Sequence, residues 1–177
     1  HMTRRTFMYS AAAAPLADAP ATPSNRPVLC IFSKHMAQFN YDELGKNAKQ
    51  VGFDGVDLTV RAKGHVSPDR AAQDLPRAAE AIRAHGLSLA MVTTNILNAN
   101  EPDTRPILST AAKLKVPFWK PGYHRYDVNN VEASVQRVRE ATVGLAALAK
   151  EYGIAAVFYN HSGDYIGSAV WDIRTII

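Results

Sequence analysis

The chain alternates between short apolar runs and amphipathic stretches from residue 28 onward. Residues 28–32 form a continuous apolar run, which is typical of a strand buried on both faces. Further strands are predicted at 56–60, 87–92, 118–120 and 154–159. The stretches between them repeat apolar residues at helical spacing. Because strand and helix alternate, the pattern predicts parallel strands joined by right-handed helical crossovers.

Residues typical of helix ends bound the amphipathic stretches. Asn40, with Glu43 three residues later, forms a capping box at the start of the first helix. Asp74 is predicted to cap the second helix, because Pro76 suits a first turn better than a helix interior. Asn130 is predicted to begin the long fourth helix, and residues 171–173 are predicted to open a fifth. Three glycines are predicted to end helices: Gly52, Gly86 and Gly153.

The spacing of these glycines measures a repeating unit. Gly86 follows Gly52 by 34 residues, and Gly153 lies two units of similar length further along. Units of about this length suit a (β/α)8 TIM barrel of roughly 250 residues. Residues 28–177 would then form about four and a half to five of its units. Five strands could equally form a complete doubly wound sheet, so the pattern alone leaves both α/β architectures open.

Composition narrows the class of protein without naming a function. The 177 residues are 47% hydrophobic and 20% charged, which suits one globular domain. No apolar run approaches the roughly 18 residues of a membrane span, so no membrane partner is expected. The net charge of +4 does not by itself indicate nucleic-acid binding. The single cysteine, Cys30, excludes an internal disulfide framework and a multi-cysteine zinc site.

Residues 1–27 have the composition of a leader rather than of a folded domain. The first two residues look like a tag remnant, and the pair Arg4 and Arg5 precedes a weakly apolar stretch and Ala17-Asp18-Ala19. This order resembles a twin-arginine export signal followed by a proline-containing linker. It predicts a periplasmic or secreted protein, and the alternative is an alanine-rich leader without that role.

Polar side chains follow all five predicted strands. The carboxyl ends of parallel strands meet at one rim, so these side chains are expected to converge there. A sugar or polyol needs many hydrogen-bond partners for its hydroxyls, and a polar rim supplies them. The expected rim residues are Arg61, His65, Thr94, Lys120, Asn160 and His161.

Two polar residues have competing interpretations. A neutral imidazole at His161 could bind a divalent metal or a sugar hydroxyl, and the other interpretation is a hydrogen-bonded structural histidine. Asp57, inside the second strand, is either a functional carboxylate or a buried charge held by an arginine or by backbone donors. His85 is interpreted as structural, because a cation at the end of a helix interacts favourably with the helix dipole.

Several different short motifs follow one another along residues 28–175. Residues 52–61, GFDGVDLTVR, are followed by Gly64-His65-Val66, and the stretches 74–76, 93–96 and 160–163 come later. In this order the motifs resemble the sugar phosphate isomerase/epimerase family of the xylose isomerase-like barrel superfamily. The resemblance implies a TIM barrel, with residues 28–177 as its N-terminal portion.

The same resemblance implies an isomerase or epimerase acting on a sugar or sugar phosphate. In that superfamily a divalent metal (Mn²⁺, Mg²⁺, Zn²⁺ or Co²⁺) polarises substrate oxygens while a carboxylate moves a proton beside a carbonyl. Its ligands typically come from strands five to eight. The fifth strand here lacks glutamate, which leaves His161 as its metal contact. No catalytic residue is assigned, and the implied substrate contacts are Arg61, His65, Thr94, Lys120 and Asn160.

Two other functions stay open. A carbohydrate-binding protein could keep the barrel without catalysis. A type IV AP endonuclease would need a histidine-rich zinc site and would bind DNA with a steep salt dependence. The predicted export signal counts against the endonuclease, so the expected partner is a small sugar or polyol and not nucleic acid. Because three strands of a barrel are not in this sequence, we expect part of a longer protein or a protomer completed by a partner in a homo-oligomer.

Overall fold

The structure is a computed structural model that describes residues 26–177, and its centre is one parallel sheet. The five strands are β1 (Cys30–Phe32), β2 (Gly55–Val60), β3 (Ser88–Thr94), β4 (Phe118–Lys120) and β5 (Ala155–Ala156). They pair in sequence order, and every pairing is parallel. This order without reversal is that of a barrel wall. The predicted barrel architecture is therefore confirmed, and the doubly wound alternative is excluded.

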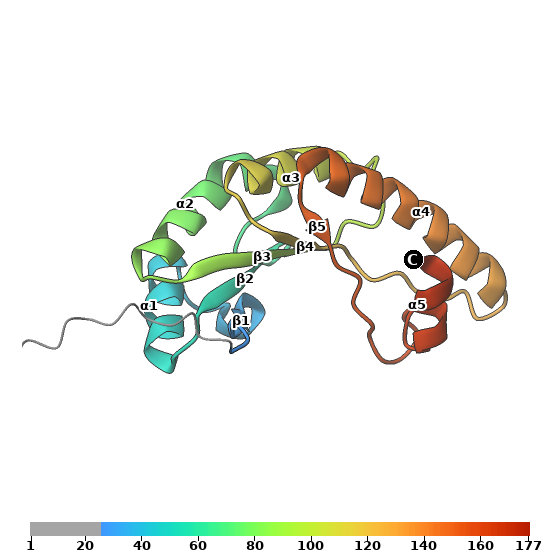
Figure 1. The fold of residues 1–177 in the computed structure, drawn as a ribbon, viewed down its shortest axis with the longest axis horizontal. Helices are drawn as coiled ribbons and strands as arrows, with labels where there is room; N and C mark the ends of the chain where they lie inside the picture. Colours follow the sequence, from blue (N-terminus) through green and yellow to red (C-terminus); the bar gives the residue numbers. More distant parts are fainter. Residues whose placement is uncertain (1–25) are drawn as a thin grey trace, which may run out of the picture.

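Helices α1 to α4 lie on the convex side of the curved sheet, and α5 lies beneath α4 (Figure 1). Two short 3-10 turns, η1 and η2, precede α1 and α2. The elements are η1 (Ser33–Met36), α1 (Tyr41–Val51), η2 (Pro68–Arg70), α2 (Ala71–Ala84), α3 (Thr104–Lys113), α4 (Val131–Tyr152) and α5 (Val170–Ile176). The predicted capping box is present at α1, where Asn40 Oδ1 accepts from the Glu43 N–H and Glu43 Oε2 accepts from the Asn40 N–H, each at 3.0 Å.

The start of α2 differs from the prediction. The helix begins at Ala71, directly after η2, so Asp74 is not its cap and Pro76 lies inside it. The turn η2 already starts the helical path three residues earlier, which the proline rule does not take into account. Asp74 instead forms ion pairs with Arg70 (2.7 Å) and Arg77 (3.3 Å) along the helix. The fifth strand is also shorter than the predicted 154–159, because only Ala155 and Ala156 pair with β4 as a strand.

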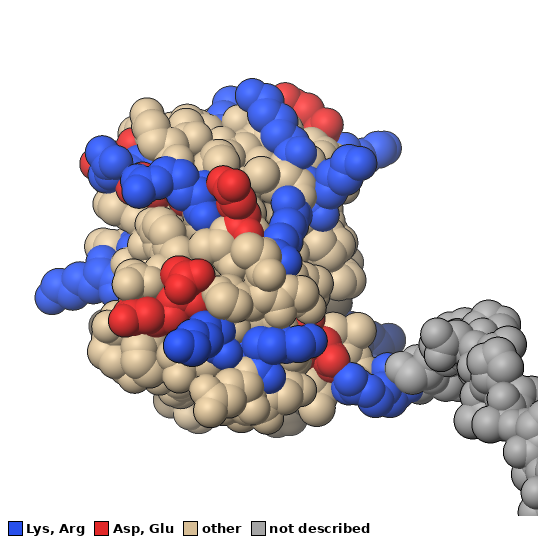
Figure 2. Space-filling view, turned by 90° about the vertical axis from the view of Figure 1, so that its left-hand side faces the viewer, with Lys and Arg blue, Asp and Glu red and all other residues tan. Residues whose placement is uncertain are grey.

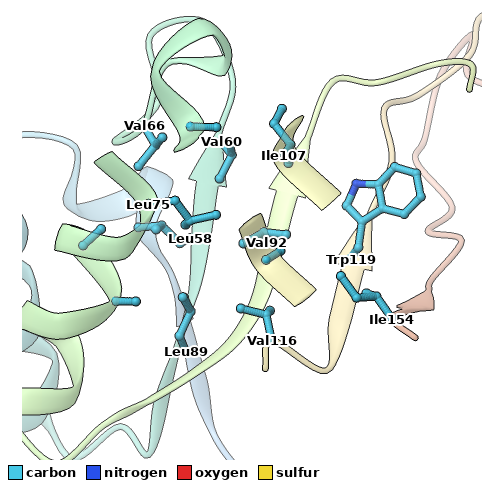
Figure 3. Close-up of a cluster of buried hydrophobic side chains, with 14 of the residues drawn as sticks. Leu58, Val60, Val66, Leu75, Leu89, Val92, Ile107, Val116, Trp119 and Ile154 are labelled. Carbon is cyan, nitrogen blue, oxygen red and sulfur yellow. The ribbon is translucent and has the colours of Figure 1, made fainter. Parts of the chain in front are cut away.

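The main hydrophobic core fills the space between the helices and the convex face of the sheet (Figure 3). Leu58, Val92 and Trp119 come from three neighbouring strands and are each fully buried. Ile82 and Ile107 cover them from α2 and α3 and are buried as completely. This dry layer holds the strands in place and leaves their alternate side chains for the concave face.

One irregularity interrupts the pairing of β2 with β3. Val56 pairs with Leu89 and Asp57 pairs with Met91, so Ala90 has no partner on β2. Because of this β-bulge, Leu89 and Val92, three residues apart, both belong to the core. Beyond the bulge, Met91 and Thr93 face the opposite side, where they line a cavity.

The surface of the helical layer carries both signs of charge. Figure 2 shows the α1 side of the molecule, where Lys and Arg are spread over the face with Asp and Glu among them. Within residues 26–177, none of the helices has the length and hydrophobicity needed to cross a membrane. The predicted export leader lies almost wholly outside the described residues.

Candidate functional site

A cavity of about 390 Å³ opens on the concave face of the sheet. This volume lies within the range of small-molecule binding sites. Strands β1 to β4, or the residues directly after them, and the segment after β5 all contribute to it. Its lining is Cys30, Phe32, Lys34, Asp57, Arg61, Met91, Thr93, Lys120, Tyr123, Tyr159 and His161.

Asp57 is the carboxylate of this cavity. It lies in the middle of β2, is 9% exposed, and accepts a hydrogen bond from Thr93 Oγ1 at 2.7 Å. Burial raises the pKa of Asp57 to about 6, against the opposing effects of the Thr93 hydrogen bond and the charges of Lys120 and Arg61. A carboxyl group with such a pKa can both take up and release a proton near neutral pH.

Lys120 is the buried amine of the cavity. It ends β4, is 6% exposed, and its Nζ donates to the Pro121 carbonyl at 2.8 Å. The same nitrogen lies 3.6 Å from the ring centroid of Tyr123. Burial lowers the pKa of Lys120 to about 8; the charge of Asp57 opposes this shift, and that of Arg61 adds to it.

The strand register places these two groups on the same face of the sheet. Asp57 pairs with Met91, two residues before the level of Thr93 and Lys120. Thr93 on β3 is the register partner of Lys120 on β4, and its hydroxyl bonds to Asp57 on β2. The strands of the carboxylate and the amine are therefore separated by one strand, or about 10 Å of backbone. Long side chains bridge part of this distance, which leaves room for a small molecule between the two groups.

An aromatic cluster borders the cavity beyond β4 and β5. The His161 ring meets Tyr123 and Tyr165 edge to face, at centroid distances of 4.9 and 4.7 Å. His161 is exposed, and its Nδ1 lies 2.9 Å from the Ser162 carbonyl oxygen. Because a carbonyl only accepts, Nδ1 carries the hydrogen in this bond, and Nε2 of the neutral ring is left as an acceptor.

The structure brings together three of the six residues expected at the rim. Arg61, Lys120 and His161 line the same cavity. Arg61 also places its guanidinium carbon 5.6 Å from the ring centroid of Phe32, on the neighbouring strand. The positions of these three residues are therefore compatible with contact to a single ligand.

The other three lie outside the cavity lining. Thr94 is buried, and its hydroxyl joins the Trp119 indole N–H (3.0 Å) to the Lys120 carbonyl (3.1 Å). His65 is half-buried in the loop after β2, where its backbone N–H donates to Thr59 Oγ1 at 3.0 Å and its ring Nε2 is enclosed without a hydrogen-bond partner among the described residues. Asn160 is exposed. Substrate contact by these residues stays a prediction.

Several cavity residues were not among the sequence-based candidates. Asp57 was weighed but not selected, although the alternation of β2 already placed it opposite the core residues Val56 and Leu58. Tyr159 carries no such signal, because it follows a two-residue strand and its position depends on the path of the chain after β5.

The described residues do not by themselves fit a metal site. Between residues 26 and 177, no group of three or more His, Cys, Asp or Glu side chains is close enough to hold a metal ion. The aromatic neighbours of His161 are tyrosines, and Asp57 is engaged by Thr93 and faces two cations. His161 therefore stands as a single candidate ligand.

No protein-family model matches this sequence, and no curated protein matches it. Solved structures do match its fold. D-allulose 3-epimerase from Methylomonas sp., in complex with D-allulose, has a TM-score of 0.61 at 11% identity, over 85% of this chain and 58% of that chain. The 3-keto-D-glucoside 4-epimerase from E. coli has a TM-score of 0.55 at 13% identity, over 77% of this chain and 59% of that chain.

A third match is a xylose isomerase-like TIM barrel protein from Mycobacterium smegmatis in complex with magnesium. Its TM-score is 0.53 at 17% identity, over 77% of this chain and 52% of that chain. This chain spans a little more than half the length of the structures that it matches. At these identities the likeness establishes the fold alone, which is five βα units of a TIM barrel.

Proposed function

We propose that this chain forms the substrate-binding part of an isomerase or epimerase that moves a proton beside the carbonyl group of a sugar or polyol-derived substrate. The observation that carries the proposal is the presence of both Asp57 and Lys120 in the lining of one cavity on the concave face. Two of the structural neighbours are sugar epimerases, and one of them was solved with its sugar bound. Their fold supports the reaction class, and the cavity supports the roles of the residues.

The carboxylate and the amine have complementary roles in such a reaction. The carboxylate of Asp57 takes the proton from the carbon next to the carbonyl, and Lys120 meets the carbonyl oxygen, where negative charge develops. Return of a proton to the opposite face of the same carbon gives epimerisation. Its return to the former carbonyl carbon, with loss of the proton from the neighbouring hydroxyl, gives isomerisation. A pKa of about 6 leaves Asp57 largely ionised at neutral pH and still able to hold the proton between the two steps.

The remaining cavity residues suit the body of a sugar. The rings of Phe32 and Tyr159 offer apolar surface to its C–H groups. Arg61 and Lys34 offer charged donors to hydroxyl or phosphate oxygens. A polyol in this cavity would exchange hydrogen bonds with water for bonds to several side chains.

We propose a divalent metal only for the complete protein, because the described residues do not supply a full set of ligands. One structural neighbour binds magnesium, whereas residues 26–177 hold no cluster of metal ligands. If the enzyme uses a metal, we propose that Nε2 of His161 is one ligand and that the others lie outside these residues. Metal analysis of the complete protein with His161→Gln, compared with His85→Gln, tests this role. Equal metal content in the two variants would remove His161 from the site.

Exchange of substrate hydrogen with solvent tests the proposed reaction. The complete protein is incubated in D₂O with a panel of ketoses and their phosphates, and loss of the proton signal beside the carbonyl is followed by NMR. We expect exchange with at least one sugar, and a loss of about a hundredfold or more in Asp57→Asn. The matched control Asp69→Asn changes an exposed carboxylate on η2 and should keep the wild-type rate.

The same experiment separates catalysis from binding alone. Sugar binding with no exchange for any panel member would select a non-catalytic carbohydrate-binding protein. Exchange that Asp57→Asn leaves unchanged would remove Asp57 from the mechanism.

We also propose that the protein acts outside the cytoplasm, on the basis of the Arg4 and Arg5 pair in its leader. Cell fractionation of the native form and of a variant with both arginines replaced by lysine tests this. Equal amounts of the two forms in the cytoplasm would contradict export.

A further inference from the structure

The environment of the Lys120 amine is unusual for a lysine. Lysine side chains are almost never fully buried unless they are paired. Lys120 is 6% exposed, yet it takes part in none of the ion pairs found among residues 26–177. Its Nζ has one hydrogen-bond acceptor, the Pro121 carbonyl, and two aromatic rings nearby, Tyr123 at 3.6 Å and Tyr159 at 6.0 Å from the ring centroids. An ammonium group has three donors, and one of them has an acceptor among the described residues, so burial here disfavours the charged form relative to water.

The amine is nevertheless within reach of a ligand. Lys120 lines the 390 Å³ cavity together with Asp57, and it also lines a second cavity of about 360 Å³ between β4, β5 and α4. The second cavity is bordered mainly by apolar residues, among them Leu145, Val157 and Ile166. Lys120 therefore lies between a pocket with several polar residues and a second pocket lined mainly by apolar residues.

Arg61 already supplies a positive charge to this cavity. A role for Lys120 as a positive charge alone therefore does not explain why a second basic group is buried there. Arg61 lines the same pocket and remains charged at any physiological pH. Its charge also lowers the pKa of Lys120, in addition to the effect of burial. A lysine that is desolvated beside another cation is the arrangement that activates an amine as a nucleophile.

We propose that Lys120 forms an imine with the carbonyl carbon of its sugar ligand. This inference rests on the proposed function, because a carbonyl sugar must enter the same cavity. The neutral amine adds to the carbonyl carbon, and a C–N bond forms while the C=O double bond becomes a C–O single bond. One proton of the added nitrogen passes to the former carbonyl oxygen, and Asp57 in its acid form gives a second proton to the resulting hydroxyl, which leaves as water. The products are an iminium ion, one water molecule and the Asp57 carboxylate.

The two groups then continue the proton transfer. The Asp57 carboxylate removes the proton from the carbon next to the iminium carbon, and the electron pair of that C–H bond moves toward nitrogen to give an enamine. Reprotonation of the enamine followed by addition of water releases the sugar and regenerates the amine. No oxidant, reductant or further reactant is required. The iminium nitrogen accepts electrons more strongly than a carbonyl oxygen does, which assigns Lys120 a covalent role.

Reductive trapping tests the imine directly. The complete protein is incubated near neutral pH with dihydroxyacetone or D-fructose and cyanoborohydride, digested, and mapped by mass spectrometry. We expect the reduced adduct on Lys120 at about a hundredfold the level on Lys46, an exposed lysine of α1, because burial lowers the pKa of Lys120 to about 8 and so raises its neutral fraction. In Lys120→Arg the adduct should disappear from that peptide, and in Lys46→Arg it should persist.

The outcomes separate this inference from the proposed function. Labelling of Lys120 no greater than that of Lys46, in a protein that exchanges sugar hydrogen with solvent, overturns the imine and leaves the isomerase or epimerase proposal standing. Absence of both labelling and exchange overturns both. The peptide map of the wild-type protein after trapping tests the imine even if Lys120→Arg does not fold.

Discussion

The two faces of the sheet are built from the same strands but differ in chemistry. Leu58, Val92 and Trp119 face the helices and are fully buried among apolar side chains. Asp57 and Lys120 face the cavity and are at most 9% exposed. Burial stabilises the first group, whereas in the second it disfavours the charged form of each side chain. Strand alternation thus keeps the residues that stabilise the fold apart from the reactive ones.

The largest effect expected from the difference between the two faces concerns the pH dependence of activity. With Asp57 at a pKa of about 6 and Lys120 at about 8, the profile of kcat/KM should be bell-shaped with its maximum between these values. The rate should fall about tenfold for each pH unit beyond either limb. Leu58→Ala, on the other face, should leave both limbs where they are. A flat profile from pH 5 to 9 would contradict the roles of both groups.

Replacement of a core residue should give the largest loss of stability. Leu58→Ala removes a fully buried side chain between β2 and the helices, and we expect it to lower the free energy of unfolding by about 2–5 kcal/mol. Urea denaturation followed by circular dichroism measures this. The adjacent Asp57→Asn provides the comparison, because it changes the other face of the same strand. Equal destabilisation by the two variants would break the proposed division between the faces.

Asp57→Asn should raise stability at neutral pH. The folded pKa of about 6 exceeds the ordinary value of 3.8, so the folded state binds more protons than the unfolded state between these values. Stability therefore falls as pH rises from about 4 to 6 and stays lowered above that, by up to ~3 kcal/mol. The asparagine keeps an acceptor for Thr93 and has no charge to desolvate. In Asp57→Asn the unfolding temperature should no longer fall between pH 4 and 6. A variant that keeps the pH dependence of the wild type would exclude Asp57 as its source.

The smallest expected effect concerns Thr94, whose buried hydroxyl accepts from the Trp119 indole N–H. Thr94→Val removes the acceptor of the Trp119 indole N–H, which is buried, and should lower the free energy of unfolding by about 1–2 kcal/mol. Thr175→Val, at an exposed position of α5, should change stability by less than about 0.5 kcal/mol. If Thr94→Val lowers sugar affinity in the exchange assay without changing stability, the threonine contacts substrate and its structural role is wrong.

Local patterns predicted the elements, and long-range contacts decided the cavity. The capping box at Asn40 and the terminating Gly52 depend on residues within one helical turn, so the sequence alone located α1. The position of Asp57 was also accessible, because strand alternation is local. Its partner Thr93 is 36 residues away, and no local pattern specifies that hydrogen bond.

Thr94 shows how a local pattern can point to the wrong face. Its position at the end of β3 suggested the rim, but Thr93 is the residue that lines the cavity. Which of two consecutive residues faces inward depends on pairing with the neighbouring strands, and here it is Lys120 on β4 that lies beside Thr93 in the register. The helix start at Ala71 was missed for a similar reason, because η2 begins the turn before the capping residue that the pattern indicated.

The bulge at Ala90 has a consequence for how this sheet can change in length. Because Ala90 has no partner on β2, deletion of that one residue would leave Leu89 toward the helices and Met91 toward the cavity, as they are now. Deletion of one residue within β2 would have the opposite result, since every later side chain of that strand would exchange faces. Ala90 is thus a position where insertions and deletions can accumulate between related proteins without exchanging structural residues for reactive ones.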